Sequence, residues 1–300
     1  MISIVGGGRV GTSIAFLCVS NALDDVLLLD HTKDKVIGES LDIANAIPPT
    51  SKFSIHGTDD YSKLSGSDIV VIATSTGVYI KNRMENMSSQ VIMIKEIARK
   101  IKQYCPSAIV LLISNPLDIL TYFFQRESEL SRFKVIGVAS SLDSSRFRYC
   151  ISEKLSIPQS SISNALVLGE HGDSLVPVFS GVSVNGKSLL SMIDGDEKDS
   201  MTSSVRNYWK KLRSYKSRSH FGIAKNAYDV INAIINSKEL AIPASVVLEG
   251  EYGEKDVAMG VPIKITSKGI IEIKDRKLDE SEQELFKISA QSIRNSIQSI

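Results

Sequence analysis

The chain of 300 residues carries 35 lysines and arginines against 34 aspartates and glutamates, and 43% of its residues are hydrophobic. This length and composition are those of an ordinary globular protein with one large domain or two. A formal net charge of +1 provides no overall field for nucleic acid or an anionic membrane surface, so we expect neither as a partner.

The cysteine pattern and the lengths of the apolar runs indicate which cellular compartment to expect. Cys18, Cys105 and Cys150 lie far apart and show no C-x-x-C spacing, which argues against a disulfide framework and against a zinc site. The sequence enters an apolar strand at Ile2 without a basic leader, and no apolar run approaches the roughly 18 residues of a membrane span. We therefore expect a reduced, cytoplasmic chain that holds no metal.

The first predicted elements are a buried strand at 2–5, a glycine turn and a helix over 12–22. Gly6, Gly8 and Gly11 fit the pattern G-x-G-x-x-G. Its first glycine permits the tight turn, the second lets the backbone approach a pyrophosphate, and the third lets helix and strand pack closely. The free N–H groups at the start of the helix then face the phosphates. Glycine turns also serve as plain connections, so the motif alone is a weak signal.

A second apolar strand, Val26–Leu29, ends at Asp30, about 20 residues beyond the glycine turn. A carboxylate at this place accepts hydrogen bonds from the hydroxyls of an adenosine ribose and repels a 2′-phosphate. The glycine turn and Asp30 together predict a dinucleotide site that prefers NAD to NADP.

Strands continue to alternate with helices as far as residue 138. Apolar strands are predicted at 69–72, 108–113 and 134–138, helices at 35–46 and from about 83 to 104, and a loop at 73–82. Alternation of this kind predicts a parallel sheet with helices on both faces, a Rossmann-type α/β domain.

Four polar residues between positions 83 and 146 stand out because of where they lie relative to the predicted strands and helices. Arg83 begins the helix after the loop, where it is either a solvated surface charge or is carried onto a substrate by a closing loop. Asn115 directly follows the strand at 108–113, at the edge where open α/β sheets bind ligands. Asp143 and Arg146 share one face of the next helix, either as a structural ion pair or pointing together into a cleft.

From residue 142 the pattern becomes mixed. We expect strands at 164–168, 178–184 and 246–248, an acidic loop at 194–199, a helix at about 219–236, a hairpin of 261–266 with 269–273, and a C-terminal amphipathic helix with Phe286, Ala290, Ile293, Ile297 and Ile300 on one stripe. No linker or internal repeat separates the two halves. The sequence thus predicts an NAD-binding Rossmann domain at 1–141 closely docked on a mixed α+β substrate domain at 142–300.

His171 lies between glycines in Gly-Glu-His-Gly-Asp at 169–173, just after the strand at 164–168. A neutral imidazole can take a proton from a hydroxyl near pH 7 and return it, so His171 is a candidate acid/base. A lone histidine is more often a surface or hydrogen-bonded core residue. The upstream motifs are what favour catalysis.

Taken together, these motifs have the order found in one family. The sequence resembles the lactate and malate dehydrogenases over nearly its whole length, in particular the lactate-dehydrogenase-like malate dehydrogenases of archaeal type. Similar blocks lie at 6–11, 41–44, 114–118, 142–146, 169–173, 250–253 and 260–262.

The resemblance implies an NAD-dependent enzyme that moves a hydride between nicotinamide and a 2-hydroxy acid. His171 would exchange the proton of the 2-hydroxyl, and Asp143 would fix the imidazole tautomer and stabilise its charged form. Arg146 would bind the C1 carboxylate with its planar fork. Asn115 and Arg83 would polarise the C2 oxygen, Arg83 arriving as the loop closes.

The remaining implied contacts concern the cofactor and the partner. Ser219 would lie beside the substrate, and a second copy of the chain would complete a homodimer or homotetramer. NAD would contact Gly6, Gly8, Arg9, Val10, Gly11, Asp30, Gln90, Ile113 and Asn115.

The departure from the family lies in the loop before Arg83. Malate dehydrogenases of the family have another arginine six residues earlier, which binds the second carboxylate of malate, and lactate enzymes typically have glutamine there. This chain has Gly77, with Lys81 as the nearest cation. The overall relationship favours malate and oxaloacetate. A glycine leaves lactate and pyruvate, or a broader range of 2-keto acids, as alternatives.

Two other classes compete with this interpretation. An NAD-dependent glycosidase would need a divalent metal, for which Cys150 and His171 are the only nearby ligands, and it would leave Asp143 and Arg146 without a purpose. A cofactor-binding sensor without turnover is compatible with the altered loop. The presence of all five proposed catalytic residues argues against it.

Overall fold

The computed structural model describes residues 1–76 and 83–300, and the side chains of residues 83–85 lie outside that description. Gly77 and Lys81 of the predicted specificity loop are therefore outside the described residues, as is the side chain of Arg83.

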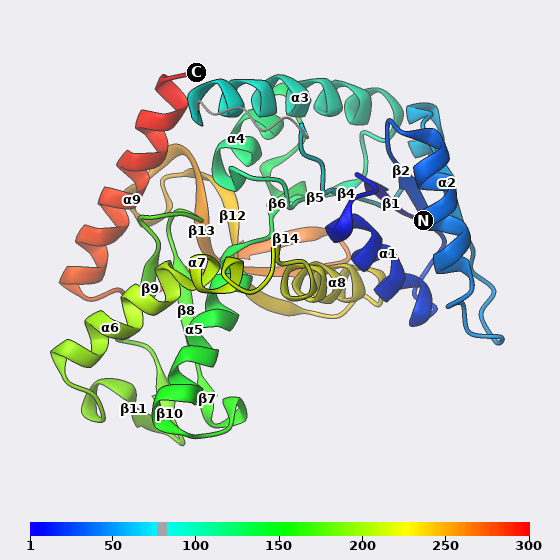
Figure 1. Ribbon diagram of the computed structural model, residues 1–300. Coiled ribbons are helices and arrows are strands. Elements are labelled where there is room, and N and C mark those ends of the chain that lie inside the picture. Colours follow the sequence, from blue (N-terminus) through cyan, green and yellow to red (C-terminus); the bar gives the residue numbers. More distant parts are fainter. Residues whose placement is uncertain (77–82) are drawn as a thin grey trace.

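A nine-stranded sheet runs through the molecule in the order β14-β13-β12-β6-β5-β4-β1-β2-β3 (Figure 1). Its parallel half consists of β1 (Ile2–Val5), β2 (Val26–Leu29), β3 (Ile55–Thr58), β4 (Ile69–Ile72), β5 (Ile109–Leu112) and β6 (Val135–Gly137). This is the order 3-2-1-4-5-6 of doubly wound dinucleotide-binding domains. The predicted Rossmann-type fold is confirmed.

Helices cover both faces of the parallel half, which is why its inner strands can be continuous apolar runs. On one face lie α1 (Arg9–Ser20), α2 (Lys33–Ala44) and α8 (Phe221–Ile235), and on the other α3 (Arg83–Tyr104) and α4 (Leu117–Ser128) (Figure 1). Every residue of β1, β2, β4 and β5 is buried, whereas the edge strand β3 buries only Ile55. The sequence did not predict β3 for that reason.

Three antiparallel strands of the second half extend the same sheet. They are β12 (Leu240–Glu249), β13 (Lys255–Thr266) and β14 (Gly269–Ile273), and β12 meets β6 where Ser245 pairs with Gly137. The predicted hairpin is therefore β13 with β14. The strand expected at 246–248 is longer than predicted, and it bridges the two halves.

Most of the remaining elements surround a second, smaller core. They are α5 (Ser140–Leu155), β7 (Ile162–Ser163), β8 (Leu166–Leu168), β9 (Val176–Val178), β10 (Ser183–Val184), β11 (Lys187–Ser188) and α6 (Gly195–Arg206). The short helix α7 (Tyr208–Arg213) follows α6, and α9 (Glu280–Gln298) packs on the main core through Phe286, Ala290 and Ile293. Phe147 of α5 and Phe179 pack edge to face at 4.8 Å between ring centres and anchor the smaller core.

In the described part of the chain, no helix is both long enough and apolar enough to span a membrane.

The acidic loop predicted at 194–199 is wrong, because these residues begin α6. Asp194 caps the helix by accepting the Glu197 N–H at 2.9 Å, and the Glu197 carboxylate accepts the Asp194 N–H at 3.2 Å. Acidic side chains in a first helical turn also face the positive end of the helix dipole. The charges thus mark a helix start and not a solvated loop.

Candidate active site

The glycine turn after β1 forms the first wall of the site. Gly6 has φ +117°, and a Cβ there would lie 2.6 Å from the Ala73 carbonyl oxygen. A Cβ on Gly11 would lie 1.9 Å from the Gly6 carbonyl oxygen, so helix and strand could not pack as they do. Gly8, which precedes α1, faces open space with no atom within 4 Å of a built Cβ. This space at a helix N-terminus fits a pyrophosphate.

Asp30 follows β2 beside the same turn. Its carboxylate, 8% exposed, accepts the Gly7 N–H at 2.7 Å and the Thr32 N–H at 3.0 Å. Burial would raise the pKa of Asp30, but the Thr32 and Gly7 N–H groups, with Lys35 and His31 nearby, lower it. The carboxylate is therefore ionised and keeps acceptor capacity for ribose hydroxyls.

The resemblance implied that Gln90 and Ile113 contact the cofactor. Gln90 is 5% exposed and donates from Nε2 to the Thr76 hydroxyl at 2.9 Å. Its Oε1 is buried and has no hydrogen-bond partner among the described residues. Ile113, 8% exposed, directly follows β5. A buried amide oxygen without a partner fits an incoming polar group such as one of the cofactor.

The centre of the site is a carboxylate that contacts both a histidine and an arginine. Asp143 Oδ2 lies 2.6 Å from His171 Nδ1, and Asp143 Oδ1 accepts from Arg146 Nη1 at 2.9 Å. The side chains of Asp143, Arg146 and His171 are 2%, 12% and 18% exposed. Arg146 thus forms the intrahelical ion pair and still presents the rest of its guanidinium, with the Tyr208 ring centre 5.3 Å from its Cζ. Arg146 can therefore form a structural ion pair with Asp143 and at the same time offer N–H groups to a ligand.

Burial and charge act in opposite directions on the imidazole. Burial would lower the pKa of His171, but the Asp143 charge and hydrogen bond outweigh it and the pKa is raised above 6.5. Burial would likewise raise the pKa of Asp143, and the His171 and Arg146 charges lower it instead. His171 can therefore be protonated near neutral pH while Asp143 stays ionised.

One site residue was missed from the sequence. Asp118, in the first turn of α4 and 3% exposed, accepts the main-chain N–H of His171 at 2.6 Å. Its sequence signals are an acidic residue within the apolar start of a helix, three positions after Asn115, and its place at the end of the family-like block 114–118.

Other predicted site residues form no hydrogen bond with this centre in the described part of the chain. Asn115 is exposed just beyond β5, and Ser219 is half-buried two residues before α8. Arg9 donates to the Ser217 hydroxyl at 3.0 Å, which ties the glycine turn to the segment before α8. Within the described residues, no hydrogen bond joins Asn115 or Ser219 to His171.

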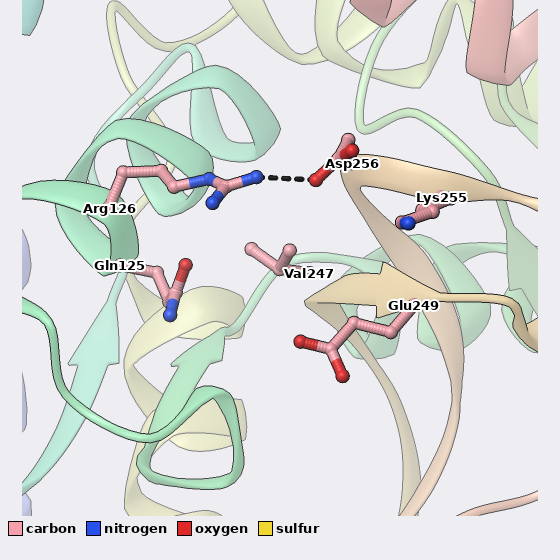
Figure 2. Close-up of a pocket in the computed structure, with 6 residues that line it drawn as sticks. All are labelled: Gln125, Arg126, Val247, Glu249, Lys255 and Asp256. Carbon is pink, nitrogen blue, oxygen red and sulfur yellow. Dashed lines mark hydrogen bonds and ion pairs between the residues drawn. The ribbon is translucent and has the colours of Figure 1, made fainter.

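A hollow of about 350 Å³ lies apart from this centre, at the far end of α4 (Figure 2). Arg126 and Asp256 form an ion pair across it, and Gln125, Val247, Glu249 and Lys255 complete its lining. Along α4, Arg126 is about 12 Å from Asp118 at 1.5 Å per residue.

Over residues 1–76 and 83–300, no cluster of three or more histidines, cysteines or acidic residues could hold a metal ion.

Comparison with known proteins gives one consistent match. Residues 1–137 match the family model for the lactate/malate dehydrogenase NAD binding domain, and residues 140–300 match that for the lactate/malate dehydrogenase alpha/beta C-terminal domain. A malate dehydrogenase of Ehrlichia canis is 32% identical, with 100% of this chain and 98% of that protein covered.

Two solved structures are similar over the whole fold. The malate dehydrogenase of Aeropyrum pernix superposes with a TM-score of 0.93 at 32% identity, covering 100% of this chain and 98% of that one. The lactate dehydrogenase of Cryptosporidium parvum, complexed with lactic acid and nicotinamide adenine dinucleotide, gives 0.94 at 33% identity, covering 99% and 96%.

Proposed function

Because the chain belongs to the lactate and malate dehydrogenase family, we propose that its physiological substrate pair is malate and oxaloacetate. As a member of that family it is an NAD-dependent oxidoreductase of 2-hydroxy acids, either malate or lactate. The observation that carries the proposed mechanism is the Asp143 carboxylate, which contacts His171 and Arg146 at once.

In this mechanism His171 handles the proton. Asp143 accepts from Nδ1 and so leaves Nε2 free to face the substrate, where it takes the 2-hydroxyl proton during oxidation and returns it during reduction. The negative charge of Asp143 stabilises the imidazolium that oxidation of the hydroxy acid produces. A bound nicotinamide would accept the hydride from C2 of the hydroxy acid, or supply it to C2 of the keto acid.

Arg146 binds and orients the substrate. The N–H groups that Asp143 does not use offer a planar fork for the C1 carboxylate. Asn115 and Arg83 are proposed to polarise the C2 oxygen, and Ser219 to line the substrate on the side of α8. Gly6, Gly8, Arg9, Val10 and Gly11 would hold the pyrophosphate, Asp30 the ribose, and Gln90, Ile113 and Asn115 the nicotinamide end.

Local charge favours a dicarboxylate over a monocarboxylate. Residues 200–228 contain seven lysines and arginines and no acidic residue, although the whole chain carries only +1. This segment includes Tyr208, which stacks on Arg146, and Lys211, whose charge acts on the thiol of Cys150 one helical turn beyond Arg146. A surplus of positive charge beside the carboxylate-binding arginine attracts an anion of charge −2 more strongly than one of −1.

We also propose the organisation of the molecule. The cofactor domain would comprise residues 1–141 and the substrate domain residues 142–300. Phe16 of α1, Leu41 of α2 and Phe221 of α8 are 47%, 66% and 69% exposed on the same face of the sheet. A second copy of the chain would cover this apolar face in a homodimer or homotetramer.

The test is NADH oxidation by the purified protein with oxaloacetate, pyruvate and branched 2-keto acids, each with and without a chelator. We expect the highest kcat/KM with oxaloacetate and no effect of the chelator. A preference for pyruvate would refute the substrate assignment. No turnover with any 2-keto acid, despite NADH binding, would favour the cofactor-binding sensor.

A further inference from the structure

Asp118 occupies an unusual position for a charged side chain. It is 3% exposed in the first turn of α4, and its Oδ2 accepts the His171 main-chain N–H at 2.6 Å. Its Oδ1 is buried and has no hydrogen-bond partner in the part of the chain that the structure describes. The hydroxyl of Ser245 is also fully buried and acts on this carboxyl, but its geometry falls short of a full hydrogen bond.

Such an arrangement is costly if its purpose is only structural. One backbone N–H could be satisfied by a neutral amide, and a half-satisfied buried carboxylate is less stable than a satisfied neutral group. Burial raises the pKa of Asp118 to about 6, although Ser245 and the His171 N–H act against this. The group is nevertheless mostly ionised above pH 7, so the protein keeps a buried negative charge under His171.

The bond also joins two parts of the proposed site. Asn115 lies three residues before Asp118 where β5 leads into α4, whereas His171 follows β8 in the other half of the chain. Both Asn115 and His171 are proposed to act on the same C2 oxygen. The hydrogen bond that the His171 main-chain N–H donates to Asp118 therefore restrains the distance between the two groups.

We propose that Asp118 is a positioning residue for His171, which holds the imidazole in register with Asn115 and uses its negative charge to favour the protonated ring. The inference rests on the proposed acid/base role of His171. The charged groups that face the imidazole are Asp143 and Asp118, which favour its protonated form, and Arg146, which opposes it. Asp118 itself is faced by His171 and Glu170.

The variant that tests this is Asp118→Asn, which keeps a carbonyl oxygen for the His171 N–H and removes the charge. Its amide N–H₂ would then be able to donate to the Ser245 hydroxyl, so the fold should be preserved. The matched control is Asp25→Asn, because Asp25 also accepts a backbone N–H, that of Ser54 at 2.8 Å, and has no contact with His171.

Two measurements separate positioning from a structural role. We expect the pKa of His171, followed by histidine NMR and assigned with His171→Gln, to fall by about half a pH unit or more in Asp118→Asn. The upper limb of the pH profile of kcat for 2-keto acid reduction should move by the same amount. We expect kcat to fall about tenfold while the Kd for NADH stays within about twofold of the unmutated value.

The outcomes are distinct. An unchanged His171 titration and pH profile in Asp118→Asn would overturn the inference, as would a loss of activity matched by an equal loss of NADH affinity. If Asp25→Asn shifts the profile equally, the effect belongs to overall charge and the inference also fails. Full turnover by His171→Gln would refute the proposed function itself. An inactive His171→Gln with an unaltered Asp118→Asn would refute only the role of Asp118.

Discussion

The buried charge of Asp118 predicts that stability and activity change in opposite directions. Asp118→Asn removes a carboxylate whose folded-state pKa, about 6, lies above its ordinary value of 3.8. Between these two values the folded protein binds the proton more tightly than the unfolded chain, so this group's contribution to stability falls as pH rises from about 4 to 6. Above that range the wild type carries the full cost of the buried charge.

The magnitude follows from linkage. A shift from 3.8 to about 6, at about 1.4 kcal/mol per pH unit, corresponds to about 3 kcal/mol. Asparagine carries no charge to bury, and its side chain can accept from the His171 N–H and donate to the Ser245 hydroxyl. We therefore expect Asp118→Asn to be more stable than wild type by up to about 3 kcal/mol at pH 8, and close to it at pH 4.

Urea unfolding at several pH values between 4 and 8, followed by far-ultraviolet circular dichroism, measures this difference. The free energy of unfolding of the variant minus that of the wild type should increase with pH and then level off above pH 6. Asp25→Asn should show no such increase, since the pKa of Asp25 is lowered by its hydrogen bonds to Ser54. A difference that is independent of pH, or a variant that is less stable at pH 8, would refute the reasoning.

Three further predictions concern the ligands. NADH should exceed NADPH in kcat/KM by at least about tenfold, or roughly 1.4 kcal/mol, and Asp30→Ser should narrow this preference; equal efficiency in the unmutated protein would contradict it. Arg146→Lys should raise KM for the keto acid severely and leave the Kd for NADH almost intact, because a point charge cannot replace the fork; comparable losses in both would make Arg146 a structural residue. Gly77→Arg should raise kcat/KM for oxaloacetate but not pyruvate, by a charge-assisted pair of about 2–3 kcal/mol. If Lys81 already supplies that charge, Lys81→Ala should instead abolish oxaloacetate reduction, and no change in either variant would exclude this loop as the specificity determinant.

The parallel sheet could be predicted because most of its strands are recognisable in the sequence as short runs of apolar residues. β1, β2, β4 and β5 are short, mostly apolar runs in which every residue is buried. β3 could not be found in this way. As an edge strand with sequence Ile-His-Gly-Thr it has one buried side chain, and its pairing with β2 is a tertiary fact.

The site was predictable only in part, for a similar reason. The spacing of Asp143 and Arg146 predicts a shared helix face, which the 2.9 Å ion pair matches. That Asp143 also contacts His171 came from the resemblance and not from the spacing, since 28 residues separate the pair. Asp118 lies 53 residues from His171 and contacts its backbone, and no sequence pattern records a side chain that binds a distant main-chain N–H.

The two carboxylates around His171 show how one fold can set opposite protonation behaviour. Asp143 has two cationic partners that outweigh its burial and lower its pKa, whereas Asp118 has one N–H, one neighbouring hydroxyl and a raised pKa. Asp143 is thus stabilised by the same ion pairs that orient the imidazole. Asp118 has no cationic side chain in direct contact, and we expect its charge to destabilise the fold at neutral pH while it favours the protonated form of His171. A variant that gains stability while its His171 titrates at lower pH is the combination that this arrangement predicts.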